Sequence, residues 1–401
     1  MSEPEFPTPD VEVESTDPQT LKDRIESGEE VFILDTRVPD DVDEWAIDGE
    51  NVESSNVPYF EFLAGDPDEE VFEQLPDDRE ITVLCGKGES SEYVAGELVE
   101  RGYDAHTLAD GMQGWARIFE SVEIDADTDA TVAQYQRPSS GCMSYLVVSG
   151  DDAAVIDPLR AFTERYREDA RALGADLTYA IDTHVHADHV SGVRALAAEG
   201  IEGVLPSVAI DRGVTYDGAV TDAEDGDVFQ VGDVEIETVF TPGHTSGMTS
   251  YLVDGAVLLT GDGLFAESVA RPDLESGDKG APDAARQLYE SLQERILTLD
   301  DDVIVGGAHF SDAADTREDG TYTETIGNLK ETMDALTLDE DEFVELVLSD
   351  MPPRPANYEE VIATNLGQEE QSDEEAFELE LGPNNCAASS DAMTDGEATQ
   401  D

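Results

Sequence analysis

The chain has 401 residues, enough for two to four domains at roughly 100 to 200 residues each, and its 39% hydrophobic content excludes a disordered or fibrous protein. Its 21 basic and 96 acidic residues give a net charge of −75. A surface this negative repels phosphate groups, so we expect no nucleic-acid partner and no membrane partner.

The composition also indicates an environment. Only four of the 21 basic residues are lysines, and an acid-rich, lysine-poor surface keeps a protein hydrated in concentrated salt. At molar salt the Debye length is about 3 Å, which screens the self-repulsion of the chain. We therefore expect a halophilic protein in a salt-rich cytoplasm. An acidic mesophilic protein with charged tails is the alternative.

Targeting and redox signals agree with a cytoplasmic location. The first 14 residues contain neither a basic nor an apolar region, and no stretch approaches about 18 uninterrupted apolar residues. The three cysteines, Cys85, Cys142 and Cys386, are too far apart for a dense disulfide framework, so a reducing compartment fits better.

Charge and hydrophobic pattern divide the chain into five segments. Residues 123–131 are rich in acids without a hydrophobic period, and residues 368–401 contain no lysine or arginine. We expect an acidic tail over 1–16, a first domain over 17–122, a linker over 123–135, a second domain over 136–367 and a disordered acidic tail over 368–401.

The first domain alternates strands and helices, which predicts an α/β fold with a parallel sheet. One predicted strand ends at Asp35 and another at Cys85, and the loop CGKGESS then opens a helix over about 90–101. A thiol at a helix N-terminus is stabilised as a thiolate, which suits nucleophilic sulfur chemistry. A purely structural role for Cys85 is the alternative.

Two segments of this domain, residues 33–52 and 102–116, resemble a single-domain rhodanese. The resemblance implies that Cys85 carries sulfane sulfur as a persulfide. Ser90 stands where that family often has an arginine, and Ala46 where it usually has a histidine. The substitution at Ser90 disfavours transfer from thiosulfate but leaves transfer from a neutral or carrier-bound persulfide open.

The second domain begins with a predicted hairpin over 143–149 and 153–158, followed by a helix and further strands. Four of its strands end in a histidine or an aspartate, and open α/β sheets place ligands at such carboxyl ends. Imidazoles and carboxylates together suit divalent zinc or iron(II). The residues concerned are His184, His186, Asp188, His189, His244, Asp262 and His309.

In this order the residues resemble the metallo-β-lactamase superfamily, which implies an αββα sandwich with metal at the edge of its two sheets. Two branches remain open. In glyoxalase II-like thioester hydrolases two zinc ions per chain are held, the first by His184, His186, His244 and Asp262 and the second by Asp188, His189, Asp262 and His309. In persulfide dioxygenases one iron(II) per chain is held by His184, His244 and Asp262, and the other four residues orient these ligands.

The segment THVHADHVSG and the segment ARPDLESGD favour the dioxygenase. The resemblance implies that Arg271, followed by Asp273, binds the carboxylate of a thiol carrier, whereas Leu274 and Glu275 depart from the family pattern. A surface ion pair is the alternative for Arg271. We assign a packing role to Cys142.

We therefore expect a rhodanese-like sulfur carrier fused to an enzyme that oxidises a low-molecular-weight thiol persulfide to sulfite with O2. A homodimer is compatible with the sequence. A binuclear zinc thioester hydrolase and a non-catalytic sulfur-trafficking or sensing protein are the alternatives.

Overall fold

The structure is a computed structural model that describes residues 7, 9, 11–63, 69–216, 220–311, 314–349, 351–352, 354–355 and 357–382; Cys386 lies outside them. The chain forms two compact units. Of the described residues, the smaller unit holds those up to Phe119 together with Arg137–Ser140 and residues 381–382, and the larger unit holds those of Glu120–Gln136 and Gly141–Glu380. No described helix is long and apolar enough to cross a membrane.

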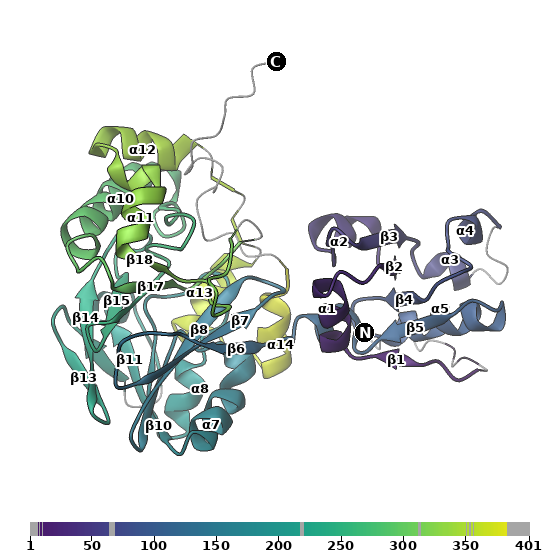
Figure 1. Cartoon of the computed structure of the whole chain (residues 1–401), viewed down its shortest axis with the longest axis horizontal. Helices are drawn as coiled ribbons and strands as arrows, with labels where there is room; N and C mark the ends of the chain where they lie inside the picture. Colours follow the sequence, from purple (N-terminus) through teal and green to yellow (C-terminus); the bar gives the residue numbers. More distant parts are fainter. Residues whose placement is uncertain are drawn as a thin grey trace. The chain divides into compact units, whose positions relative to one another are not determined.

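The smaller unit is built on a parallel sheet in the order β1-β5-β4-β2-β3 (Figure 1). This confirms the predicted α/β domain. The strands are β1 (Ser15–Thr16), β2 (Val31–Asp35), β3 (Val52–Asn56), β4 (Ile81–Leu84) and β5 (Ala105–Leu108). The helices are α1 (Pro18–Glu26), α2 (Pro39–Glu44), α3 (Phe60–Leu63), α4 (Glu69–Glu73), α5 (Glu89–Glu100) and α6 (Gly111–Trp115).

Burial explains why β2 and β4 lie inside this sheet. Every residue of VFILD and of ITVL is buried, as expected for central strands covered on both faces. Helix α5 buries Val94, Ala95 and Leu98 on one apolar face. Its first turn follows Gly88, so the segment between β4 and α5 holds Cys85 at the carboxyl edge of the sheet.

The larger unit contains two sheets. The first has the order β12-β11-β10-β9-β8-β7-β6. Its strands are β6 (Glu120–Glu123), β7 (Thr131–Arg137), β8 (Cys142–Ser149), β9 (Asp152–Ile156), β10 (Asp176–Ile181), β11 (Glu202–Pro206) and β12 (Val220–Ala223). The predicted hairpin is present as the antiparallel pair β8 and β9, and β9 to β12 run parallel.

The second sheet has the order β13-β14-β15-β16-β17-β18. Its strands are β13 (Val228–Val231), β14 (Val234–Phe240), β15 (Thr249–Val253), β16 (Val257–Gly261), β17 (Ile304–Gly307) and β18 (Glu324–Thr325). A buried apolar cluster joins the two sheets face to face, with Ile156 and Val147 from the first sheet and Tyr251 and Leu259 from the second. The unit is therefore a sandwich.

Helices cover the outer faces of the sandwich (Figure 1). The first sheet carries α7 (Thr163–Ala172) and α8 (Val193–Ala198). A second apolar cluster packs the second sheet against α10 (Gly277–Ser291), its π-helical extension Leu292–Ile296, α11 (Ile326–Thr332) and α12 (Glu340–Ser349). This arrangement confirms the predicted αββα sandwich. The remaining helices are α9 (Ser207–Asp211), α13 (Tyr358–Asn365), α14 (Asp373–Leu379) and the 3-10 turns Arg160–Phe162 and Asp334–Thr337.

Two segments differ from the expected boundaries. The expected linker contributes β7, which pairs with β6 in the first sheet, because Val132 and Tyr135 supply buried side chains. The expected disordered tail over 368–401 contains α14, which begins with a capping box between Ser372 and Glu375 and buries Phe377. The expectation of disorder rested on the acid content alone, which does not indicate this helix. Residues 383–401 lie outside the described part of the chain.

Candidate metal centre

Strand ends of the sandwich bring all seven predicted metal-site residues together. The segment after β10 carries His184, His186, Asp188 and His189, and the segments after β14, β16 and β17 carry His244, Asp262 and His309. Each of the seven is buried. Carboxyl ends of neighbouring strands meet at one edge, which is why residues so far apart in sequence converge. They fall into three groups whose ligand atoms lie within 4.8 Å of one another.

The first group is His184, His244 and Asp262. Nε2 of His184 lies 3.5 Å and Nε2 of His244 lies 3.3 Å from Oδ2 of Asp262. Neither Nε2 of His184 nor Oδ2 of Asp262 has a hydrogen-bond partner among the described residues, although both are buried. Unsatisfied buried polar atoms that converge in this way fit a bound cation.

In each of the two imidazoles the hydrogen bond is made by Nδ1, so Nε2 keeps a lone pair that can bind a metal. Nδ1 of His244 donates to the carbonyl oxygen of Arg271 over 2.9 Å. The hydroxyl of Thr183 donates to Asp157, so it accepts from Nδ1 of His184 at 2.9 Å. Burial lowers the pKa of His244 to about 4 and also lowers the pKa of His184. Both rings are therefore neutral at pH 7 and ready to bind a metal.

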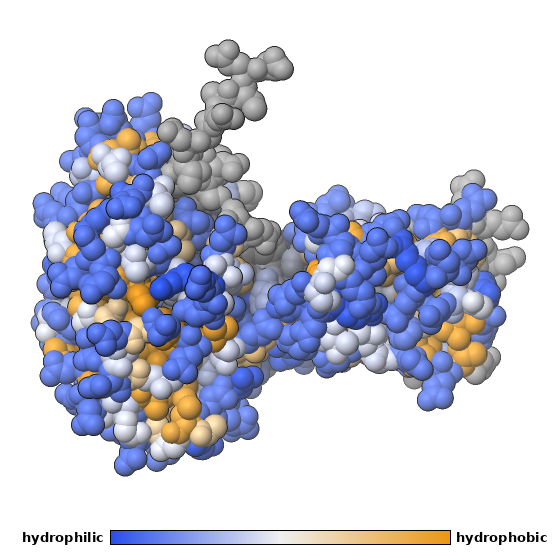
Figure 2. Space-filling view, viewed as in Figure 1, coloured by the Kyte–Doolittle hydropathy of each residue, from blue (hydrophilic) through white to orange (hydrophobic). Residues whose placement is uncertain are grey.

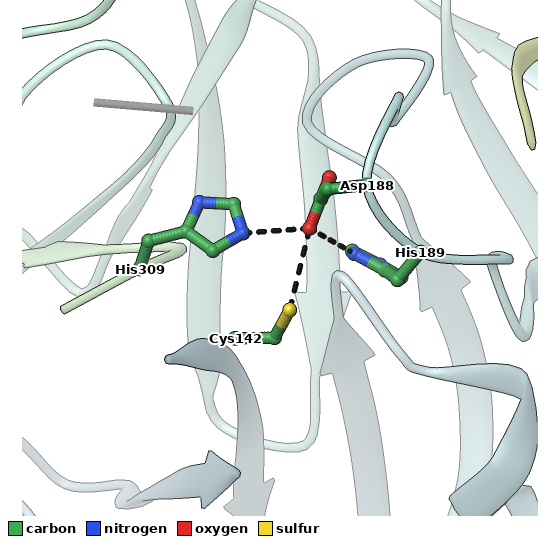
Figure 3. A group of neighbouring side chains, drawn as sticks. All are labelled: Cys142, Asp188, His189 and His309. Carbon is green, nitrogen blue, oxygen red and sulfur yellow. Dashed lines mark hydrogen bonds and ion pairs between the residues drawn. The ribbon is translucent and has the colours of Figure 1, made fainter. Parts of the chain in front are cut away.

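The second group is Cys142, Asp188, His189 and His309, which Figure 3 draws together. Oδ2 of Asp188 lies 2.8 Å from Nε2 of His309 and 3.1 Å from Nδ1 of His189, and it accepts from the thiol of Cys142 at 3.3 Å. Nδ1 of His309 lies 2.6 Å from Oδ1 of Asp262. Burial lowers the pKa of His309, but Asp262 and Asp188 outweigh it and hold that pKa well above its usual range. Without a metal, His309 is a cation between two carboxylates.

The third group is Asp157, Asp182 and His186. Nε2 of His186 lies 3.0 Å from Oδ1 of Asp157 and 3.7 Å from Oδ1 of Asp182. Although burial lowers it, these carboxylates raise the pKa of His186 to about 9, whereas burial raises the pKa of Asp182 to about 7. Nδ1 of His186 has no hydrogen-bond partner within the described ranges. This pairing orients a ring that stands beside His184, with ring centroids 4.2 Å apart.

Asn365 is a positioning residue that the sequence analysis missed. Its Nδ2 donates to the carbonyl oxygens of His186 and His189 at 3.0 and 2.8 Å. Its Oδ1 accepts from the backbone N–H of Ser191 at 2.8 Å. The last residue of α13 thus fixes the backbone that carries three of the histidines. Its place before Leu366-Gly367 was the only signal in the sequence.

Gly261 places Asp262 at the end of β16. Its φ is +51°, and a Cβ there would lie 2.3 Å from Oγ1 of Thr183 and 2.4 Å from Cε of Met248. Only glycine accepts both the left-handed backbone and this close approach. The chain after β16 can therefore turn Asp262 toward His184.

Arg271 and Asp273 form a buried pair next to this centre. Nε and Nη2 of Arg271 donate to the two carboxylate oxygens of Asp273 at 2.7 and 3.1 Å. Asp273 also accepts from Nε of Arg354 at 3.0 Å. Arg271 is 1% exposed, so it is not a surface ion pair. Its contact with a thiol carrier stays a prediction, because in this structure its guanidinium group donates to Asp273.

In the smaller unit, Cys85 lies in the loop between β4 and α5. The backbone N–H of Gly88 points to its Sγ at 3.1 Å, and the thiol is 5% exposed. Gly111 packs against this loop so closely that a Cβ would lie 2.1 Å from the carbonyl oxygen of Cys85. The loop therefore presents a backbone donor to a sulfur just before the start of a helix.

Comparison with known proteins places this geometry in a family. The family model "Metallo-beta-lactamase superfamily" matches residues 138–309, and the model "Rhodanese-like domain" matches residues 17–118. A hydroxyacylglutathione hydrolase of Synechococcus sp. (strain JA-2-3B'a(2-13)) is 30% identical over 215 residues, 49% of this chain and 84% of that protein. The chain belongs to the metallo-beta-lactamase superfamily. Its metallo-beta-lactamase domain follows a rhodanese-like domain.

Two further relatives of the metallo-beta-lactamase domain are similar over most of their own length. The human mitochondrial persulfide dioxygenase ETHE1 is 29% identical over 240 residues, 58% of this chain and 86% of that protein. The crystal structure of ETHE1 from Myxococcus xanthus matches with a TM-score of 0.51 at 28% identity, covering 59% of this chain and 97% of that one. With the buried, unsatisfied ligand atoms, these matches support a metal-dependent enzyme.

Proposed function

We propose that the protein is an iron(II) persulfide dioxygenase that oxidises the terminal sulfur of a thiol persulfide to sulfite, with Cys85 as a sulfur carrier. The observation that carries the proposal is the first group, in which two neutral imidazoles and one carboxylate converge with unsatisfied atoms. Two histidines and one carboxylate form the facial ligand set of non-haem iron oxygenases. The similarity to two ETHE1 proteins supports the same branch.

The reaction is RSSH + O2 + H2O → RSH + H2SO3. The terminal sulfur gives four electrons to O2, and its bond to the carrier sulfur breaks as the thiol leaves. Iron(II) held by His184, His244 and Asp262 would supply the one-electron chemistry that activates O2. The chain's own residues fix the ligand geometry: the Arg271 carbonyl and Thr183 set the two imidazole tautomers, and burial excludes bulk water.

The test is O2 uptake by anaerobically purified, iron-loaded protein in high-salt buffer with a small-molecule persulfide. We expect sulfite to appear with one O2 consumed per sulfite, and Asp262→Ala to abolish both. Asp283→Ala is the matched control, because its side chain is 91% exposed and pairs only with Arg286 at 3.3 Å among the interactions described. Folded, iron-replete wild type that consumes no O2 with several persulfides would overturn the proposal.

A second candidate is a binuclear zinc thioester hydrolase. It is favoured by the second group beside the first and by Nδ1 of His186, which is buried and has no hydrogen-bond partner among the described residues. The similarity to the Synechococcus hydrolase also favours it. Zinc-loaded protein that hydrolyses a glutathione thioester, together with no O2 uptake by the iron-loaded form, would replace the first proposal with this one.

The role of Cys85 has its own test. Sulfur transfer from a persulfide donor to Cys85 should be detected by mass spectrometry as a gain of one sulfur atom, and Cys85→Ser should lose it. Cys85→Ser should retain O2 uptake when a free persulfide is supplied. If Cys85 takes up sulfur while the metal site catalyses no reaction, the result would support the third alternative, a sulfur-trafficking or sensing protein.

A further inference from the structure

We propose that a pocket of the larger unit binds a short-chain hydroxy carboxylate, with its carboxylate between Arg160 and Arg194 and its hydroxyl on Thr364. The pocket lies among α8, the turn Arg160–Phe162, α13 and the segment that leads into α14. None of the seven metal-site residues is among the described residues that line it. The inference does not depend on the reaction proposed above.

The size and lining of the pocket suit a small organic molecule. Its volume is about 160 Å³, and Val190, Ala195 and Tyr216 contribute to a mainly apolar wall. A cavity of about 150 Å³ holds a molecule of the size of benzene, so this pocket accepts about six or seven non-hydrogen atoms. Small-molecule sites typically combine such walls with a few well-placed polar groups.

Two cations line this pocket, although the chain has only 21 basic residues among 401. The side chains of Arg160 and Arg194 are 23% and 27% exposed, so their guanidinium groups reach the solvent. Among the hydrogen bonds described, Arg194 donates only to Glu370. A guanidinium group has five N–H donors, so Arg194 keeps donors for the carboxylate of a ligand.

Thr364 is an independent sign of a ligand. It lines the pocket and is 2% exposed, and its Oγ1 is buried without a hydrogen-bond partner among the described residues. A buried hydroxyl without a partner costs free energy, which a hydroxyl on the ligand would recover. Because Thr364 is buried while both arginines reach the solvent, the ligand places its carboxylate outward and its hydroxyl inward.

Glu370 competes with the ligand for Arg194. It also lines the pocket, and its carboxylate forms an ion pair with Arg194. The Glu370 side chain is 81% exposed, so this pair contributes little free energy, and the side chain can turn into the solvent. Arg160 is likewise held by an exposed carboxylate, because its Nε donates to Asp373 at 3.0 Å. A ligand carboxylate can therefore replace these contacts.

The inner wall of the pocket is rigid. Ser191 and Asn365 both line it, and the backbone N–H of Ser191 donates to Oδ1 of Asn365 at 2.8 Å. The hydroxyl of Tyr216 donates to the carbonyl oxygen of Asn365 at 2.5 Å. Because these residues are already fixed by hydrogen bonds, the ligand pays little for ordering the protein.

A ligand-observed NMR titration tests the pocket. Full-length, zinc-loaded protein in molar potassium chloride is titrated with β-hydroxybutyrate, butyrate or β-hydroxybutyramide. We expect saturable binding of β-hydroxybutyrate in the millimolar range. Butyrate lacks the hydroxyl and should bind about three- to tenfold more weakly. The amide lacks the charge and should not bind measurably.

Variants of the polar groups should shift the affinity in opposite directions. Thr364→Val should lower the affinity for β-hydroxybutyrate to that for butyrate and leave butyrate binding unchanged. Arg194→Gln should weaken binding of both acids by about fivefold or more. Glu370→Gln should strengthen binding of both by about two- to fivefold, because the competing carboxylate is removed.

Two further variants locate the ligand. Ala195→Leu fills the pocket without changing its charge and should abolish binding of both acids. Arg286→Gln is the matched control, because Arg286 lies on α10 outside the lining of the pocket and its side chain is 44% exposed. It should bind both acids as wild type does. Circular dichroism checks that each variant is folded.

Four outcomes would overturn the site. They are no saturable binding of β-hydroxybutyrate up to about 50 mM, equal binding of the amide, binding of sulfate in place of the carboxylate, and binding that persists in folded Ala195→Leu. The last result would place the ligand elsewhere, for example on the metal. Because binding is measured without persulfide or O2, failure of the dioxygenase proposal would leave this result unchanged.

Discussion

His186 and Asp157 are joined by a hydrogen bond of 3.0 Å in which the imidazole Nε2 donates to a carboxylate oxygen. Asp157 adopts φ of +51° at the end of β9 and also accepts from the backbone N–H of Thr183 at 2.7 Å. One carboxylate therefore fixes both a histidine ring and the backbone that leads to His184. This contact places Asp157 behind the first group as a positioning residue.

We expect Asp157→Asn to weaken metal binding roughly 10- to 100-fold, because an amide keeps the size of the carboxylate but loses the charge that orients the His186 ring. Competition with a chromophoric chelator measures the affinity. The pKa of His186 should fall from about 9, which NMR titration of the metal-free protein follows. An unchanged affinity would show that the pairing does not support the first group. Asp283→Asn is the matched control.

The Asn365 contacts predict a stability effect. Asn365→Leu leaves the carbonyl oxygens of His186 and His189 and the N–H of Ser191 without their partner. We expect a loss of about 1–3 kcal/mol in the free energy of unfolding, together with reduced metal content. Guanidinium unfolding and elemental analysis measure the two effects. Gln368→Leu, at an exposed position nearby, removes only an exposed hydrogen bond to the carbonyl oxygen of Gly213 and should change both quantities far less.

A side chain at position 261 is expected to clash with its neighbours, and Gly255 serves as the control position. Gly261→Ala adds a Cβ that would clash with Thr183 and Met248, so we expect a loss of about 1–3 kcal/mol in stability and lower metal occupancy. Gly255 has a similar φ of +70°, but a Cβ there meets nothing within 4 Å. Equal thermal shifts in Gly261→Ala and Gly255→Ala would mean that backbone strain alone accounts for the effect.

Asp273 predicts a dependence of stability on pH. Burial raises its pKa, but Arg271 and Arg354 outweigh burial and hold the pKa below its ordinary value of 3.8. Its contribution to stability is therefore present above pH 3.8 and is lost as the pH falls through the lower folded-state pKa. Asp273→Asn should cost about 3 kcal/mol or more near neutral pH, with a difference from wild type that shrinks in acid. Melting temperatures at several pH values measure this; a constant difference would contradict it.

The charge predicts a dependence of stability on salt. Hydrophilic residues cover most of the visible surface of each unit, and the net charge is −75 (Figure 2). Screening of this self-repulsion should raise the melting temperature between 0.1 M and molar potassium chloride, where the Debye length falls from about 10 to about 3 Å. A melting temperature that does not rise with salt would favour the mesophilic alternative.

Strand-end patterns made the fold and the histidine cluster predictable. The buried runs that end at Asp35 and Cys85, and the runs that end before His184 and Asp262, are strands as expected. The same pattern holds for Asp157 and Asp182, which follow β9 and β10 directly, yet the sequence analysis assigned a role to neither of them.

Other features depend on contacts that no local pattern encodes. Cys142 approaches Asp188 across 46 positions of sequence, and Asn365 reaches the His186 carbonyl across 179. The sequence analysis predicts that Arg271 binds the carboxylate of a thiol carrier. Its pairing with Asp273 depends on the course of the backbone, which no local pattern gives. Helix α14 was likewise not predicted, because its segment is rich in acids. The helix is stabilised by the burial of Phe377 and by its capping box.

The Asn365 contacts also set an order of events during synthesis of the protein. The ribosome adds His184 long before Asn365, so the nascent chain exposes its histidine segment before the residue that fixes its backbone exists. A geometrically complete site forms only once α13 has emerged and docked. The hydrogen bonds that fix this backbone can therefore form only after nearly all of the described chain has been translated.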